Sequence, residues 1–132
     1  MQVTVPISVG ELLDKITILE IKAERIGDAA KRANIDHELG LLRERRDALG
    51  LARAKAADEI DRLVGELGQV NRRLWDVEDD LRRLEARQEF GRDFVALARS
   101  VYRENDRRAE IKRALNRLTG SALVEEKSYS AG

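Results

Sequence analysis

The chain has 132 residues, with 25 basic and 25 acidic side chains, so its formal net charge is zero. It contains no cysteine, which excludes disulfides and thiolate metal sites. Opposite charges alternate along the chain, a pattern typical of solvated helix surfaces and not of a surface that binds nucleic acid. The length predicts a single domain, residues 1–132.

The first residues predict a short extended segment followed by a helix. Gln2 to Ile7 alternates in the manner of a β-strand, so residues 1–7 are expected to be extended, with Pro6 near their end. Ser8, with Glu11 three residues later, has the pattern of a capping box and predicts a helix over Val9–Ile26. No signal peptide is recognisable, and no apolar run approaches the ~20 residues that span a bilayer. We therefore expect a cytoplasmic protein without membrane insertion.

Glycines divide the rest of the chain into three further helices. Gly27 and Asp28 start a second helix, which runs to about Leu49. A third helix is predicted from about Ala52 to Glu89, and on the order of 55 Å long if it is continuous. Its apolar residues are spaced alternately by three and four, the heptad seam of a coiled coil or bundle. The seam consists of Ile60, Leu63, Leu67, Val70, Leu74, Val77, Leu81 and Leu84.

The last helix is predicted over about Arg92 to Thr119 and folds back along the third helix after a turn at Phe90 and Gly91. Residues 121–132 are expected to form a mobile tail. The fold class is therefore all-α: a long antiparallel, coiled-coil-like hairpin with two further helices packed alongside as a bundle.

The first helix is apolar on nearly every side, which predicts an interior position. One face carries Leu12, Ile16 and Leu19, while Ile18 and Ile21 point the other way. A helix of this kind is expected to lie between its own bundle and either the second helix or a second protomer. We accordingly predict a homodimer.

Several polar residues fall inside the apolar arcs of the helices when each is placed on a wheel at about 100° per residue. A turn near residue 90 also brings the polar groups of the third and fourth helices to the same level. They are Glu20 on the first helix, Asn71 and Glu78 on the third, with Trp75 at the edge of its arc, and Asn105, Arg108, Lys112 and Asn116 on the fourth.

Two interpretations of these polar residues remain open. One is structural, with salt bridges such as Glu20–Arg108 or Glu78–Lys112. The other is a ligand-binding pocket between helices, lined by seven of these residues (all except Asn116) and suited to a small carboxylate, a phosphate or a sugar. His37, the single histidine, stands between two acids and reads as an exposed, ion-paired residue. No metal site, cofactor or catalytic residue is predicted.

Four stretches carry a family resemblance: SVGELLDKITILEIKAERI from Ser8, LWDVEDDLRRLE from Leu74, FVALARSVYRENDRRAEIKRALN from Phe94, and LVEEKSYS near the end. Together they resemble a family of small, uncharacterised bacterial all-helical proteins, a domain of unknown function. The resemblance implies a setting in surface-glycan or glycosylation pathways and assigns no catalytic residue. Residues 28–57 show no specific match.

For function, we expect a non-enzymatic helical accessory or scaffolding protein that acts through protein–protein contacts. One alternative is a small-anion or sugar-phosphate binding protein that uses the inter-helical polar residues. A second is a small all-helical enzyme of the chorismate-mutase type, an analogy at the level of fold only.

Overall fold

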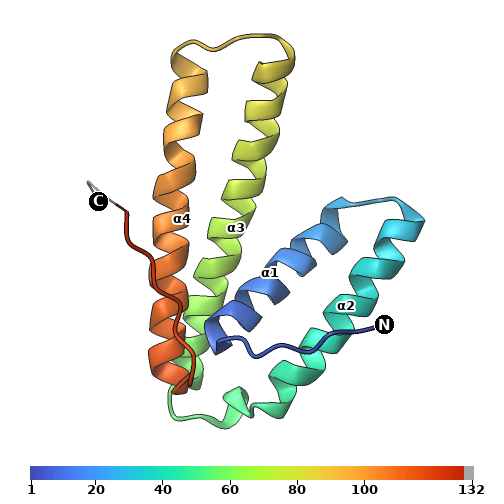
Figure 1. Ribbon diagram of the computed structural model, residues 1–132, viewed down its shortest axis with the longest axis vertical. Helices are drawn as coiled ribbons and strands as arrows, with labels where there is room; N and C mark the ends of the chain where they lie inside the picture. The colour runs from blue at the N-terminus through green and yellow to red at the C-terminus, as the bar shows by residue number, and fades with distance from the viewer. Residues whose placement is uncertain (130–132) are drawn as a thin grey trace.

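The computed structural model describes residues 1–129, and its regular elements are helices (Figure 1). This arrangement confirms the all-α prediction. The predicted strand-like residues 2–7 are extended but form no strand, and the last three residues of the predicted mobile tail lie outside the described part of the chain. The elements are α1 (Val9–Arg25), α2 (Ala29–Ala48), the short 3₁₀ helix η1 (Leu51–Arg53), α3 (Ala57–Ala86) and α4 (Arg92–Thr119).

The helix starts follow the capping residues that the sequence offers. The Ser8 hydroxyl accepts the Glu11 backbone N–H at 3.0 Å, and the Asp28 carboxylate accepts the Lys31 N–H at 3.0 Å. The third helix begins at Ala57, five residues later than predicted. Gly50, at φ +67°, takes the left-handed conformation that favours glycine and turns the chain into η1 before α3 can start.

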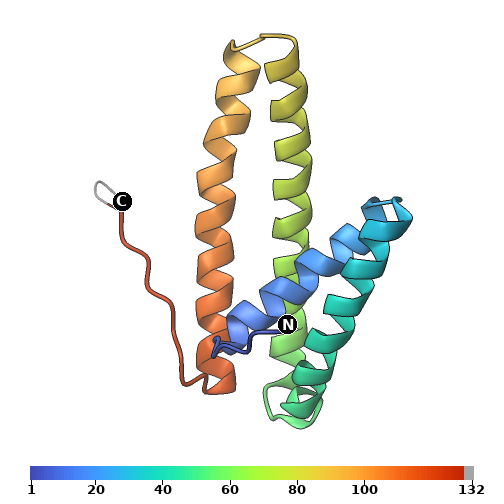
Figure 2. The ribbon, with the colours of Figure 1, turned by 45° about the vertical axis from the view of Figure 1, so that its right-hand side comes forward.

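The helices form two pairs that meet along α1. The antiparallel hairpin of α3 and α4 rises well beyond the shorter pair of α1 and α2 (Figures 1 and 2). α1 contacts α2 on one side and both long helices on the other. The chain after α4 runs back beside that helix, on the side away from α3 in Figure 2.

Two apolar clusters hold these layers together, and α1 contributes to both. The cluster toward α3 and α4 contains Leu13, and the cluster toward α2 contains Leu12, Ile16 and Leu19. Ile21 is only 2% exposed. Since most of both apolar faces of α1 is covered within one chain, that helix no longer gives a reason to expect a homodimer.

The upper part of the hairpin has no such cover. No residue from Glu78 to Glu110 is buried, and we call these residues the arm. Both helices of the arm are well formed and pack against each other (Figure 2), and the lower end of the arm also contacts α1 through Arg108. Among residues 1–129, no helix is long and apolar enough to cross a membrane. The seam of the arm consists of the half-buried residues Leu81, Leu84, Phe94, Leu97 and Val101.

Candidate functional site

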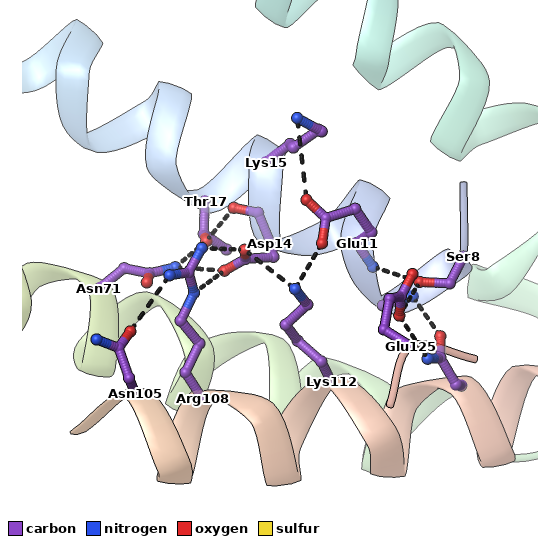
Figure 3. Close-up of polar contacts among 12 residues, drawn as sticks. Ser8, Glu11, Asp14, Lys15, Thr17, Asn71, Asn105, Arg108, Lys112 and Glu125 are labelled. Atoms are coloured by element: carbon purple, nitrogen blue, oxygen red, sulfur yellow. Dashed lines mark hydrogen bonds and ion pairs between the residues drawn. The ribbon is translucent and has the colours of Figure 1, made fainter. Parts of the chain in front are cut away.

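A buried carboxylate on α1 organises the polar contacts between α1 and the hairpin (Figure 3). Asp14 is 0% exposed and receives the Arg108 guanidinium from α4, Nε on Oδ1 at 2.9 Å and Nη2 on Oδ2 at 2.5 Å. The Asn71 amide of α3 donates to the same Oδ1 at 2.9 Å. The hydrogen bonds to Asp14 raise the pKa of Arg108, against burial, which lowers it. A carboxylate without water needs such partners, because burying it alone is costly.

Polar neighbours on α1 and α4 add hydrogen bonds to the Asp14–Arg108 ion pair. Thr17, one turn after Asp14, donates its hydroxyl to the Asp14 carbonyl at 2.8 Å and accepts the Asn71 amide at 2.8 Å. On α4, Asn105 lies one turn before Arg108 and accepts its Nη1 at 3.5 Å. Asn71 thus joins α3 to α1, and Arg108 joins α4 to the same carboxylate. We call these five residues, together with Glu11 and Lys112, the polar joint. The five are Asp14, Thr17, Asn71, Asn105 and Arg108.

A second ion pair adjoins the first because both helices repeat polar residues at helical spacing. Lys112, four residues after Arg108, donates to the Glu11 carboxylate at 2.5 Å and lies 3.7 Å from Asp14 Oδ2. Glu11 stands three residues before Asp14 and is also approached by Lys15 at 3.9 Å. Two cations from α4 therefore balance two carboxylates from α1, so these four groups together have no net charge.

The free N–H groups at the start of α1 are taken by side chains from the other end of the chain. The Gly10 N–H donates to Asn116 Oδ1 at 2.7 Å, and the Val9 N–H donates to the Ser121 hydroxyl at 3.1 Å. The Ser8 hydroxyl donates to Glu125 at 2.8 Å. Burial tends to raise the pKa of Glu125, but the Ser8 and Asn116 hydrogen bonds outweigh it and the pKa is lowered. This helix terminus is therefore already occupied.

Close approach of backbones makes this docking possible. A Cβ atom on Gly10 would lie 2.6 Å from the Lys112 carbonyl oxygen and 2.9 Å from Asn116 Oδ1. Only a residue without a side chain lets α1 sit this near to α4. The glycine of the Ser8–Gly10–Glu11 stretch is thus a packing residue.

The structure brings together four of the seven predicted site residues in the polar joint: Asn71, Asn105, Arg108 and Lys112. The two predicted salt bridges are wrong. Glu20 faces α2 and lies 3.5 Å from Arg43, and Glu78 is exposed and lies 3.6 Å from Arg82. The angle on a wheel does not distinguish between the two covered sides of α1, so it could not show that Glu20 faces α2. Glu78 falls in the arm, where the apolar arc of α3 is no longer buried.

The partner that sequence reasoning missed is Asp14. It lies four residues before Ile18 and seven before Ile21, so it belongs to the same face as two apolar residues that were assigned to an interior. That position was a sufficient signal. Glu11, Ser8 and Glu125 carried a weaker one, because each also fits a simple surface or capping role.

A groove opens beside the joint, between α1 and the lower part of the arm. Its volume is about 360 Å³. Apolar side chains of α1 and α3 form its walls, and the Arg25 guanidinium lies 5.8 Å from the Trp75 ring centroid. Four predicted site residues line this groove: Asn71, Trp75, Glu78 and Arg108.

Fold and site together define a small all-α protein in which a buried inter-helical ion-pair network docks a helical pair onto a protruding hairpin. The chain belongs to a family of unknown function (DUF6165), whose family model matches residues 3–132. Neither the curated proteins nor the solved structures contain a match to this chain.

Proposed function

We propose that the protein is a helical accessory or scaffolding protein that binds a partner protein through its arm. The observation that carries this proposal is the absence of any buried residue from Glu78 to Glu110. A two-helix hairpin has an apolar seam but no third element to cover it, and such pairs gain most of their stability from further packing. A third helix supplied by a partner would complete the arm as a bundle.

The arm carries a second apolar stripe beside its seam, suited to a partner helix. Val95, Ala98 and Tyr102 lie on one side of α4 at a spacing of three and four, and Val95 and Tyr102 are 50% and 53% exposed. Hydrogen bonds from Arg103 and Arg99 lower the pKa of Tyr102, so cations flank the stripe. The matching partner is an amphipathic helix with acidic residues beside its apolar stripe.

Replacing each of two alanines of α4 with aspartate, one inside the stripe and one outside it, tests the stripe. Ala98 and Ala96 are both exposed on α4, but only Ala98 belongs to the stripe, while Ala96 faces another side. Ala98→Asp should reduce partner binding at least about tenfold, because it places a charge in an apolar contact, and Ala96→Asp should leave binding unchanged. Partners are captured on the tagged full chain, identified by mass spectrometry, purified, and titrated by calorimetry.

Both variants introduce the same charge and the same helix-propensity cost, so circular dichroism should show equal helix content. A purified partner that binds the Ala98→Asp and Ala96→Asp chains equally well would contradict the use of this stripe. The proposal would also fail if no protein were retained above the level of an unrelated helical control. Where a partner is captured, its identity tests the predicted place in glycosylation pathways.

Ligand binding in the groove beside Trp75 is the second candidate function. It is favoured by the convergence of Asn71, Trp75, Glu78 and Arg108 on one concave surface, with Arg82 at its edge. An aromatic ring, an amide and charged groups suit a sugar or a small anion such as a sugar phosphate. Arg108 is bound to the buried Asp14, whereas the pair of Arg82 with Glu78 is longer, at 3.6 Å, and exposed to solvent. Arg82 is therefore the cation expected to meet the anion.

The single tryptophan makes this candidate directly measurable. Titration with glucose 1-phosphate should change Trp75 fluorescence saturably in the wild-type chain. Arg82→Gln should weaken binding by roughly tenfold, because an exposed charge-assisted contact is lost while the polar joint is intact. Arg83→Gln, an exposed neighbour outside the groove, is the control. A fluorescence signal that does not saturate, or that both variants share, would count against the groove as a ligand site.

A further inference from the structure

The N-terminal segment has the properties of an unpaired β-strand. Residues 2–7 are extended, and no backbone group of Gln2 to Ile7 has a hydrogen-bond partner among residues 1–129. The segment is rich in β-branched residues, which favour strands. Its apolar side chains alternate on one face and are open to solvent, Val3 at 76%, Val5 at 62% and Ile7 at 37% exposed. An extended chain with free N–H and C=O groups is a template for pairing with another strand.

The sequence of this segment is suited to pairing with itself. Val3 and Val5 are placed symmetrically about Thr4, so an antiparallel pair centred on Thr4 sets each valine opposite a valine of the other copy. In antiparallel ladders, hydrogen-bonded and non-hydrogen-bonded pairs alternate. When Thr4 occupies a non-hydrogen-bonded pair, the two valine pairs exchange four ladder hydrogen bonds.

The same register accommodates the one proline of the chain. Pro6 then stands opposite Gln2 in another non-hydrogen-bonded pair, where the N–H that proline lacks would point away from the partner strand. If Thr4 instead occupied a hydrogen-bonded pair in the same register, Pro6 would also fall in a hydrogen-bonded pair and remove a ladder bond. The position of Pro6 therefore favours the form of this register in which Thr4 occupies a non-hydrogen-bonded pair.

An apolar groove beside the segment gives the paired strands a surface to rest on. A groove of about 760 Å³ separates residues 2–7 from α2, and Leu12, Leu41 and Leu42 line it. A single strand leaves this groove open. A two-stranded ribbon presents twice the number of valines on one face, and an isolated ribbon needs such packing to be stable.

We propose that residues 2–7 of two copies pair as an antiparallel β-ribbon centred on Thr4 and that the protein is a dimer through this ribbon. The surface is separate from the arm, so the dimer and the binding of a partner helix are independent. A strand edge of a different protein is the competing occupant, and in that case the purified chain would be a monomer.

Cysteine cross-linking tests the register without disturbing the rest of the chain, which has no cysteine. In the proposed ribbon the two Thr4 Cα atoms are about 4.5 Å apart, within the range of a disulfide. The two Gln2 residues, on the same face, are separated by four residues along the strands, or roughly 13 Å. Under mild oxidation of the full chain, Thr4→Cys should form a disulfide-linked dimer at least about tenfold faster than Gln2→Cys.

Sedimentation equilibrium tests the ladder itself. The wild-type chain should have twice the 15.0 kDa mass of one copy. Val3→Pro removes an N–H that the ladder uses in both copies and should raise the dimer dissociation constant about tenfold or more. Thr4→Pro, whose missing N–H points outward, should leave it unchanged. Equal helix content by circular dichroism confirms that the helices are intact in both variants.

Three results would each overturn the proposal. They are a wild-type chain that stays monomeric at tens of micromolar, equal cross-linking rates for the two cysteine variants, and a dimer that Val3→Pro does not weaken. The last result would show that two copies meet through another surface.

Discussion

Replacing Arg108 with methionine should destabilise the protein by about 3–5 kcal/mol, the range found when one partner of a buried ion pair is removed. The reason is Asp14, which is 0% exposed and would keep its charge with only Asn71 and the more distant Lys112 to balance it. Urea unfolding followed by circular dichroism measures the loss. Arg82→Met is the control, because its ion pair with Glu78 is exposed and should contribute at most about 1 kcal/mol.

Second substitutions identify which carboxylate is left without its partner. Asp14→Asn keeps an acceptor for Asn71 and removes the buried charge, so adding it to Arg108→Met should restore much of the lost stability. Adding Glu20→Gln or Glu78→Gln should restore nothing, because these carboxylates lie beside Arg43 and Arg82. Unchanged stability of the Arg108→Met chain would instead indicate that the joint is held at a cost to stability, as binding sites often are.

The second large effect is expected from the smallest change, Gly10→Ala. The added methyl group would meet the Lys112 carbonyl oxygen at 2.6 Å, so α1 and α4 would have to separate and the Gly10–Asn116 hydrogen bond would lengthen. We expect a loss of roughly 1–3 kcal/mol, as for other overpacked contacts, measured as a lower urea midpoint.

Gly65→Ala is the matched control, since nothing lies within 4 Å of a Cβ at that position. The residue is in the middle of α3 and exposed to solvent. Alanine should stabilise the helix there by up to about 1 kcal/mol. The two variants should therefore change the free energy of unfolding in opposite directions. A Gly10→Ala chain as stable as the wild type would mean that the helices can part without cost.

Local signals in the sequence were enough to predict the helices. Ser8, Asp28 and the glycines near residues 27, 91 and 120 determine where the chain can begin and end a helix, and the predicted bounds of the last helix are those observed. Where a signal was ambiguous the prediction failed: helix propensity between Ala52 and Ala56 was overridden by the turn that follows Gly50.

The partners within the site could not be predicted with equal success, because a wheel gives the angle of a side chain but not the element it faces. Arg108 and Asn71 were found since their helices have one apolar arc each. On α1, which is covered on two sides, the same procedure selected Glu20 and passed over Asp14. The predicted hairpin register was close to the observed one. A fold at Phe90 and Gly91 would set Arg73 level with Arg108, and Arg73 pairs with Glu104, about one helical turn away.

The polar joint also determines the order in which the chain can fold. Its ion pairs connect residues 94 and 101 positions apart, Arg108 with Asp14 and Lys112 with Glu11, whereas α3 and α4 are joined by a short turn. Contacts between neighbouring segments form sooner than those that close long loops. The hairpin can therefore assemble first. Although α1 is synthesised earlier, its Asp14 carboxylate stays hydrated until the end of α4 has been synthesised and α1 can dock.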